Sequence, residues 1–251
     1  MLPNPWDAGS AKLLASLGFQ ALATTSSGFA ATLGRADGSV SRDEALAHAT
    51  SIVAATELPV SADLENGFAD SAEEVAETAA GAVAAGLAGF SIEDFTGDQD
   101  DPIYPLEVAA ERVAAAARVA HAGPRLVLTA RSENFLHARA DLADTIERLR
   151  AYEAAGADVL YAPGLIDAAD IRAVITAVGK PVNVLARPGV PPVAELAALG
   201  VSRVSVGGAF AFAAVAGALA AAQELRERGT YGFAADAAAG SRAAQRAFSA
   251  Q

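Results

Sequence analysis

Short apolar segments alternate with longer amphipathic segments along most of the chain. Runs of four or five apolar residues predict strands, and apolar residues that recur at helical spacing predict helices. The predicted strands lie at Ala21–Thr25, around Val60, and at Gly89–Ile92, Leu126–Ala130, Asp158–Tyr161, Pro181–Leu185 and Arg203–Val206. The predicted helices lie at Trp6–Leu17, Ser41–Thr56, Ser71–Ala85, Leu106–Ala120, Asp141–Ala155, Ala168–Val178, Pro192–Leu199 and Phe210–Arg228.

Strands that are apolar throughout and alternate with helices are typical of a parallel sheet covered by helices. Met1–Asn4 is a candidate eighth strand, and eight strand–helix units close a (β/α)₈ TIM-type barrel. We therefore predict an α/β protein in which residues 1–251 form a single barrel domain, with 229–251 as a C-terminal helical extension. An open doubly wound sheet is the alternative. It would need a glycine-rich phosphate loop after an early strand, and Ser26-Ser27-Gly28-Phe29, which we interpret as a turn, does not have that pattern.

Polar side chains gather where the predicted strands end. In barrel enzymes this carboxyl-end rim carries the active site. The residues at or just past a strand end are Ser27, Asp63, Glu65, Glu93, Arg131 and Asn183.

Asp63 and Glu65 are separated by one residue at the end of the Val60 strand. In an extended segment this spacing places both carboxylates on one face, where they repel each other unless a cation or a shared proton lies between them. Carboxylate oxygens are the ligands that Mg²⁺ prefers, so the pair predicts a magnesium site. A solvated strand end with a turn at Asn66-Gly67 is the alternative.

Composition narrows the function classes. The chain is 53% hydrophobic and has no apolar run that approaches the length of a membrane span, so we predict no membrane association. A formal net charge of −12 argues against nucleic acid as a partner, because phosphate binding needs clustered Lys and Arg. The N-terminus lacks the features of a signal peptide, and the chain contains no cysteine. We expect a cytoplasmic protein without thiol chemistry.

Six segments, in this order and spacing, resemble the isocitrate lyase/phosphoenolpyruvate mutase superfamily. They are Asn4-Pro5-Trp6-Asp7-Ala8, Thr25-Ser26-Ser27-Gly28-Phe29, Asp63-Leu64-Glu65-Asn66-Gly67, Ser91-Ile92-Glu93-Asp94, Thr129-Ala130-Arg131 and Pro181-Val182-Asn183. The resemblance implies a (β/α)₈ barrel that binds Mg²⁺, with Mn²⁺ as an alternative. It also implies a small-molecule 2-oxo or 2-hydroxy carboxylate substrate that reacts through an enolate. A homodimer or homotetramer that exchanges a C-terminal helix is the implied assembly.

The resemblance also implies roles for individual residues. Asp63 matches the direct metal ligand, and Glu65 and Glu93 match acids that hold the metal through water. Asp37 matches a further acid on a nearby loop, and Arg131 matches the arginine that pairs with the substrate. We therefore expect Arg131, Glu93 and Asp37 to act in catalysis.

The remaining matches concern substrate binding. Ser27 and Gly28, with Phe29 beside them, match the segment that holds the substrate carboxylate. Asn183 matches an amide near the distal end of the substrate. A plain turn would explain Ser27 and Gly28 equally well, and Asn183 could simply close its strand.

Two departures limit the analogy. Lyases of this superfamily that split isocitrate or methylisocitrate place Cys, Lys and His on a gating loop, and residues 94–104 here contain none of them. The acid expected after the fifth-strand motif is also missing from Tyr161-Ala162-Pro163-Gly164. A magnesium-dependent carbon–carbon lyase that resembles oxaloacetate decarboxylase is the favoured function. Candidates for a general acid or base are Tyr161, Glu133 and Asp98.

Several alternatives stay open at the level of sequence. The core could support phosphonopyruvate hydrolase or phosphoenolpyruvate mutase chemistry, isocitrate or methylisocitrate cleavage without the thiol, or binding of a 2-oxo acid without catalysis. Val204–Ala209, a strand that ends in Gly-Gly before a helix, could instead cradle a phosphate, as in phosphosugar enzymes. Such enzymes do not need the acids at the rim.

Overall fold

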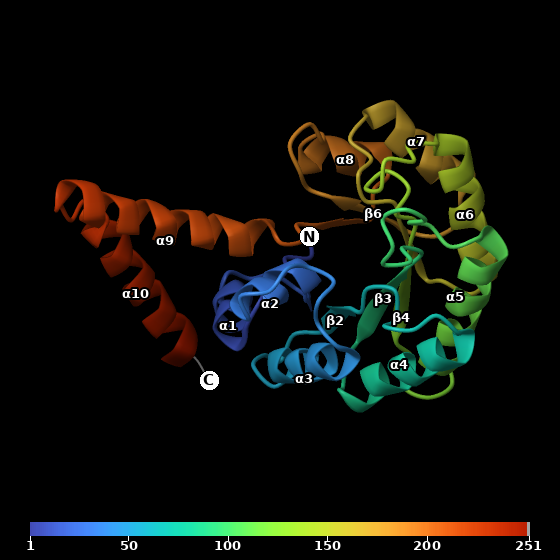
Figure 1. Cartoon of the computed structure of the whole chain (residues 1–251), viewed down its shortest axis with the longest axis horizontal. Helices are drawn as coiled ribbons and strands as arrows, with labels where there is room; N and C mark the ends of the chain where they lie inside the picture. Colours follow the sequence, from blue (N-terminus) through green and yellow to red (C-terminus); the bar gives the residue numbers. More distant parts are fainter. Residues whose placement is uncertain (250–251) are drawn as a thin grey trace.

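A seven-stranded parallel sheet curls into a nearly closed barrel with helices on its outer face (Figure 1). The computed structural model describes residues 1–249. Each strand pairs with the next strand along the chain, which is the order of a TIM-type barrel. The strands are β1 (Leu22–Ala23), β2 (Val60–Asp63), β3 (Gly89–Glu93), β4 (Val127–Arg131), β5 (Val159–Tyr161), β6 (Val182–Leu185) and β7 (Arg203–Ser205).

The N-terminal segment lies between the last strand and the first. Leu2 forms a parallel bridge with Ser205 of β7, and its backbone N–H donates to the carbonyl of Val204 at 2.7 Å. On the other side, the N–H of Ala23 donates to the carbonyl of Pro3 at 3.1 Å. The candidate eighth strand is therefore present as a single bridge, and this seam completes the barrel.

The helices begin where the sequence supplies a capping side chain. Asp7 and Ser10 form a capping box at the start of the first helix, and Ser41 and Glu44 do the same for α3. The helices that follow the strands agree with the predicted segments. They are α1 (Ala8–Ser16), α3 (Arg42–Val53), α4 (Ala72–Ala84), α5 (Leu106–Ala120), α6 (Leu142–Ala154), α7 (Ala168–Ala177) and α8 (Val193–Leu199).

The segment after β1 is a helix, α2 (Ser26–Thr32), and not the turn predicted from Ser-Ser-Gly. Thr25 is its N-cap, and the Thr25 hydroxyl accepts a hydrogen bond from the N–H of Gly28 at 3.3 Å. Small polar residues are common both in turns and in the first turn of a helix. In the folded protein the segment is helical, and this conformation buries Gly28 and Ala30.

Residues of the strands alternate between two environments. Phe90, Leu128 and Leu160 are fully buried in the apolar core. The alternate positions line the inside of the barrel, and many of them carry small polar side chains instead of the Val, Ile and Leu that usually fill a barrel. These include Ser61, Ser91, Thr129, Asn183 and Ser205. The interior therefore keeps a cavity.

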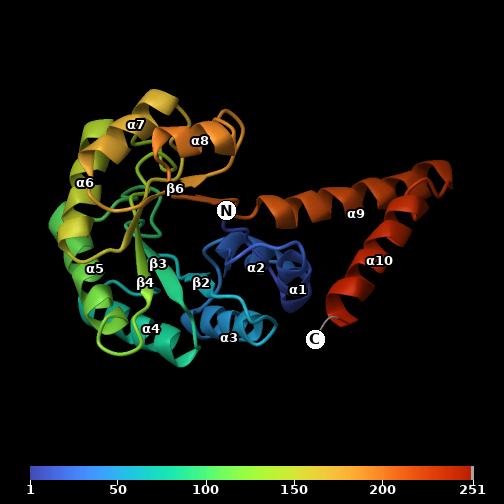
Figure 2. The same cartoon turned by 180° about the vertical axis from the view of Figure 1, so that it is seen from behind.

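Two C-terminal helices, α9 (Ala209–Arg228) and α10 (Ala234–Ser249), project from the barrel as an arm (Figure 2). α10 turns back to pack against α1, while α9 is almost entirely exposed. By length and hydropathy α9 could cross a membrane, so the sequence-based statement that no segment approaches such a span is too strict for this helix. Exchange of a C-terminal helix between subunits stays a prediction.

Candidate active site

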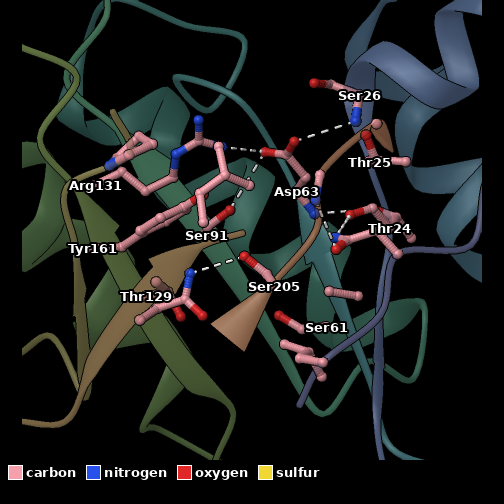
Figure 3. A pocket seen from close by; sticks show the side chains of 18 of the residues that line it. Thr24, Thr25, Ser26, Ser61, Asp63, Ser91, Thr129, Arg131, Tyr161 and Ser205 are labelled. Carbon is pink, nitrogen blue, oxygen red and sulfur yellow. Dashed lines mark hydrogen bonds and ion pairs between the residues drawn. The ribbon is translucent and has the colours of Figure 1, made fainter. Parts of the chain in front are cut away.

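A cavity of about 200 Å³ opens at the carboxyl ends of the strands. Figure 3 shows Asp63 and Arg131 pointing toward each other in the wall of this cavity, with Tyr161 near Arg131. Ser205 lies farther along the barrel. The cavity is lined by residues of β1 to β7, by the N-terminal segment and by the start of α2. This is the rim at which the sequence placed the site.

Asp63 is held by donors from three directions. Its Oδ1 pairs with Nη1 of Arg131 at 2.9 Å and accepts a 3.4 Å hydrogen bond from the Ser91 hydroxyl. Its Oδ2 accepts from the backbone N–H of Ser26, the first residue of α2, at 3.2 Å. The backbone N–H of Asp63 itself donates to the Thr24 hydroxyl at 2.9 Å. These contacts fix the orientation of the carboxylate.

Arg131 is the centre of a buried ion-pair cluster at the end of β4. Its Nη2 lies 3.0 Å from a carboxylate oxygen of Glu93, and its Nε lies 2.8 Å from one of Glu133. The guanidinium also lies over the Tyr161 ring, 5.3 Å from its centroid. Burial alone would lower the pKa of Arg131, but Glu133, Glu93 and Asp63 raise it well above its usual value. Arg131 therefore carries a permanent positive charge.

Glu65, Glu93 and Asp37 border a second, adjoining cavity of about 520 Å³. Burial, and then the charges of Asp63 and Asp37, raise the pKa of Glu65 to about 8. Burial also raises the pKa of Glu93 and of Asp37. Asp37 reaches the main cavity as well, where its side chain bonds to Ser26. Asp37 thus comes close to Asp63 and Glu65 although it lies on a different loop of the chain.

The donor set fits a Mg²⁺ ion. Five carboxyl groups lie around the one guanidinium of Arg131, namely those of Asp37, Asp63, Glu65, Glu93 and Glu133. Within residues 1–249, no group of three or more His, Cys, Asp or Glu side chains is arranged so that it could hold a metal ion by itself. Mg²⁺ seldom needs one, because it binds through one or two carboxylates and keeps several waters. Asp63, Glu65 and Glu93 therefore supply carboxylate oxygens of the kind that Mg²⁺ binds, and no complete protein cage is required.

The predicted carboxylate-binding segment is divided between two places. Ser27 lines the main cavity. Gly28 is buried behind it, where a Cβ would lie 3.2 Å from the Cβ atoms of Trp6 and Ala211. Phe29 stacks on His48 with ring centroids 3.9 Å apart and lines a smaller neighbouring cavity. Only Ser27 of the three is therefore on the wall of the main cavity.

Asn183 lies in the interior, within a hydrogen-bond network that the sequence did not reveal. Its amide donates to the Ser205 hydroxyl at 2.9 Å, and its carbonyl oxygen accepts from Nε of Arg203 at 2.9 Å. Tyr161 completes the group, because its hydroxyl also bonds to Ser205. Arg203 was not predicted as a residue of the site. Strand alternation could have indicated it, because Arg203 stands two residues before Ser205 in β7 and therefore points to the same face of the strand.

The loop after β3, residues 94–104, is tied to the loop after β4. Phe95 stacks on His137 with centroids 3.9 Å apart and forms an antiparallel bridge with Ile103. Of the three candidates for a general acid or base, Tyr161 lines the main cavity. Glu133 is buried against Arg131. Asp98 is exposed and accepts a hydrogen bond from the N–H of Asp100.

The Gly207-Gly208 segment is occupied by contacts within the chain. The N–H groups of Val206 and Gly207 both donate to Oδ1 of Asn4, at 2.9 and 3.0 Å. A Cβ on Gly208 would lie only 2.5 Å from the Ser27 hydroxyl. The glycines therefore permit close packing, and two of the N–H groups that a phosphate would need are already used.

Comparison with known proteins gives a consistent result. The sequence pattern described as phosphoenolpyruvate phosphomutase matches residues 1–226. A 2-methylisocitrate lyase of Escherichia coli is 33% identical over 184 residues, which are 70% of this chain and 61% of that protein.

Two solved structures share the fold. One, from Burkholderia cenocepacia and assigned only provisionally as a lyase or mutase, is 57% identical with a TM-score of 0.90 and covers 92% of this chain and 84% of its own. The other is oxaloacetate acetylhydrolase in complex with the product oxalate. It is 25% identical with a TM-score of 0.83 and covers 92% of this chain and 83% of its own.

Proposed function

The chain belongs to the phosphoenolpyruvate phosphomutase family, within the isocitrate lyase/phosphoenolpyruvate mutase superfamily of enzymes, and on this premise we propose that it is a Mg²⁺-dependent carbon–carbon lyase. Its substrate is a small 2-oxo or 2-hydroxy carboxylate, and decarboxylation of oxaloacetate is the favoured reaction. The observation that carries the proposal is the cluster in which Asp63 and Arg131 meet, 2.9 Å apart, at the wall of the cavity.

The acids of the cluster and Arg131 would have different roles. Asp63 would hold the metal directly, with Glu65, Glu93 and Asp37 assisting through water. Bound Mg²⁺ supplies a Lewis-acid charge that draws electron density from the 2-oxo group. Arg131 uses three N–H groups on Asp63, Glu93 and Glu133, so two of its five donors remain for substrate oxygens. These donors would stabilise negative charge as it develops on the substrate.

Loss of CO₂ suits the groups that are present. The bond between C3 and the departing carboxylate breaks, CO₂ leaves as a neutral molecule, and its electron pair forms the enolate of the remaining 2-oxo acid. No base is needed for this step. The enolate then takes up a proton, and Tyr161 retains one at neutral pH because burial raises its pKa to about 12. Cleavage of a 2-hydroxy acid would require a base for the hydroxyl group, which makes it the second choice.

A panel of substrates tests the proposal. The purified protein is incubated with Mg²⁺ and, in separate reactions, with oxaloacetate, methylisocitrate, isocitrate or phosphonopyruvate, and release of pyruvate or glyoxylate is followed. We expect turnover of oxaloacetate above the rate with free Mg²⁺ alone, and loss of that turnover after chelation. Release of inorganic phosphate from phosphonopyruvate, with oxaloacetate untouched, would assign the chain to P–C bond cleavage instead.

We further propose that α9 mediates assembly into a homodimer or homotetramer. Its exposed side chains are largely apolar, with 50% of Phe212, 53% of Val215 and 56% of Leu219 accessible. Such a surface on a helix that leaves the barrel is typical of a subunit interface. A membrane would also cover it, but the resemblance noted above favours a second copy of the chain.

Light scattering after gel filtration is expected to give a mass that is a multiple of 25.2 kDa. Replacing Val215 and Leu219 together by Glu should shift the protein to the monomer, because two charges would then lie in the interface. Val108→Glu, which adds one charge at an exposed apolar position of α5, away from α9, is the control. A wild-type monomer in detergent-free buffer would contradict the assembly.

A further inference from the structure

Arg203 places a cation inside the barrel, at the start of β7. Its Nε donates to the Asn183 carbonyl oxygen at 2.9 Å, and its Nη2 donates to the Thr129 hydroxyl at 2.8 Å. Both acceptors are neutral. Among the described residues, Arg203 has no carboxylate within ion-pair distance, and its Nη1 has no hydrogen-bond partner. Burial lowers the pKa of Arg203 to about 10, so the group stays charged at neutral pH.

The surroundings of Arg203 are polar but uncharged. It lines the main cavity together with Ser61, Thr129 and Ser205, all of which carry hydroxyl groups. It also borders a smaller, mostly apolar cavity toward the amino ends of the strands. A half-buried guanidinium without an anion is costly, because its charge has lost part of its hydration and gained no counterion. Arg131 and its three carboxylate partners, Asp63, Glu93 and Glu133, lie at the carboxyl ends of the strands, whereas Arg203 stands at the start of β7.

We propose that Arg203 forms an anion subsite in the barrel interior and that it positions the second carboxylate of the bound substrate, distal to the end held at Asp63 and Arg131, until that carboxylate leaves as CO₂. This inference rests on the proposed function and narrows it to dicarboxylic 2-oxo acids. A substrate that spans the cavity would place one end beside Arg131 and the other beside Nη1 of Arg203. Asn183 would then act on the substrate by fixing the Arg203 side chain.

Charge and size select a carboxylate over a phosphonate. The subsite offers one positive charge, which a carboxylate balances and a phosphonate dianion would exceed. The Asn183 amide donates one N–H to Ser205 and its oxygen accepts from Arg203, so it has only one further N–H to offer and no charge. The cavity of about 200 Å³ also limits the substrate to a small acid.

Calorimetry with two probes separates the two ends of the site. Oxalate is short and tests the end at Asp63 and Arg131, whereas 3,3-difluorooxaloacetate carries the additional distal carboxylate. Both are titrated, with Mg²⁺ present, into the wild type, Arg203→Met, Arg203→Lys and the exposed control Arg118→Met. We expect Arg203→Met to raise the Kd of 3,3-difluorooxaloacetate about 30-fold or more while that of oxalate is unchanged. The Kd of 3,3-difluorooxaloacetate for Arg203→Lys should lie between those for the wild type and Arg203→Met, because lysine keeps the charge and loses the planar guanidinium group.

The outcomes separate the subsite from the catalytic proposal. If oxalate binds and Arg203→Met weakens neither probe, or weakens both equally, the subsite is overturned and the proposed lyase stands. If neither probe binds the wild type in the presence of Mg²⁺, both proposals are overturned. A melting temperature for each variant shows whether it is folded. If Arg203→Met is unfolded, the neutral and polar variant Arg203→Gln takes its place, and equal Kd values of 3,3-difluorooxaloacetate for Arg203→Gln and the wild type overturn the subsite.

Discussion

Replacing Asp63 by asparagine is expected to lower kcat/KM by about 10³-fold or more, the largest effect of any single substitution in this protein. The substitution keeps the size of the side chain and removes its charge. Among residues 1–249, Asp63 is the one acid that contacts Arg131, borders the main cavity and is oriented by the N–H of Ser26. Without its charge we also expect no heat of Mg²⁺ binding in calorimetry, with or without oxalate.

Asp43→Asn is the matched control for this experiment. The Asp43 side chain is 94% exposed at the start of α3, so the same chemical change there should leave turnover and Mg²⁺ binding as in the wild type. Circular dichroism establishes that both variants are folded. Turnover by Asp63→Asn at the wild-type rate would remove Asp63 from the metal site and with it the proposed mechanism.

Replacing Arg131 by lysine is expected to reduce kcat/KM by about 10²- to 10³-fold, although the charge is retained. A single ammonium group cannot contact Asp63, Glu93 and Glu133 and still offer two donors to the substrate. The free energy of unfolding should also fall, by about 1–3 kcal/mol, because a buried carboxylate loses a hydrogen bond. Steady-state kinetics and urea unfolding measure the two effects separately.

Arg172→Lys, on the exposed side of α7, serves as the control for both measurements. A normal kcat/KM in Arg131→Lys, together with reduced stability, would mean that Arg131 only neutralises the acids around it. The opposite pattern, reduced turnover with normal stability, would mean that the buried acids reorganise around lysine and that the loss lies in contacts with the substrate.

Much of the fold is encoded locally. Ser41 and Ser71 stand where the predicted helices begin, and each caps its helix by satisfying N–H groups that the helix leaves free; the first helix begins after Asp7, two residues later than its predicted start at Trp6. The α2 helix escaped prediction because Thr25, Ser26 and Ser27 suit a turn as well as a cap. Only its burial against neighbours from distant parts of the chain, including Ala211, distinguishes the two.

The site was predictable to the extent that it depends on strand ends. Asp63, Glu93 and Arg131 meet because β2, β3 and β4 are neighbours in register, where Glu93 pairs directly with Arg131. The partners that hold them, such as Thr24 and Ser91, depend on the tilt of the strands, which sequence spacing does not fix. Phe29 shows the limit of analogy, since its ring packs on His48 beside the cavity and not on its wall.

The seam between β7 and the N-terminal segment also orders events during synthesis. Leu2 leaves the ribosome about 200 residues before Val204, its hydrogen-bond partner. The hydrogen bond between them therefore cannot form until nearly the whole barrel has been synthesised. Contacts between such distant parts of a chain form slowly. A nascent chain that stops before β7 would therefore leave Leu2 and one edge of β6 without a partner and open to aggregation, and addition of β7 is the step that a chaperone would have most reason to protect.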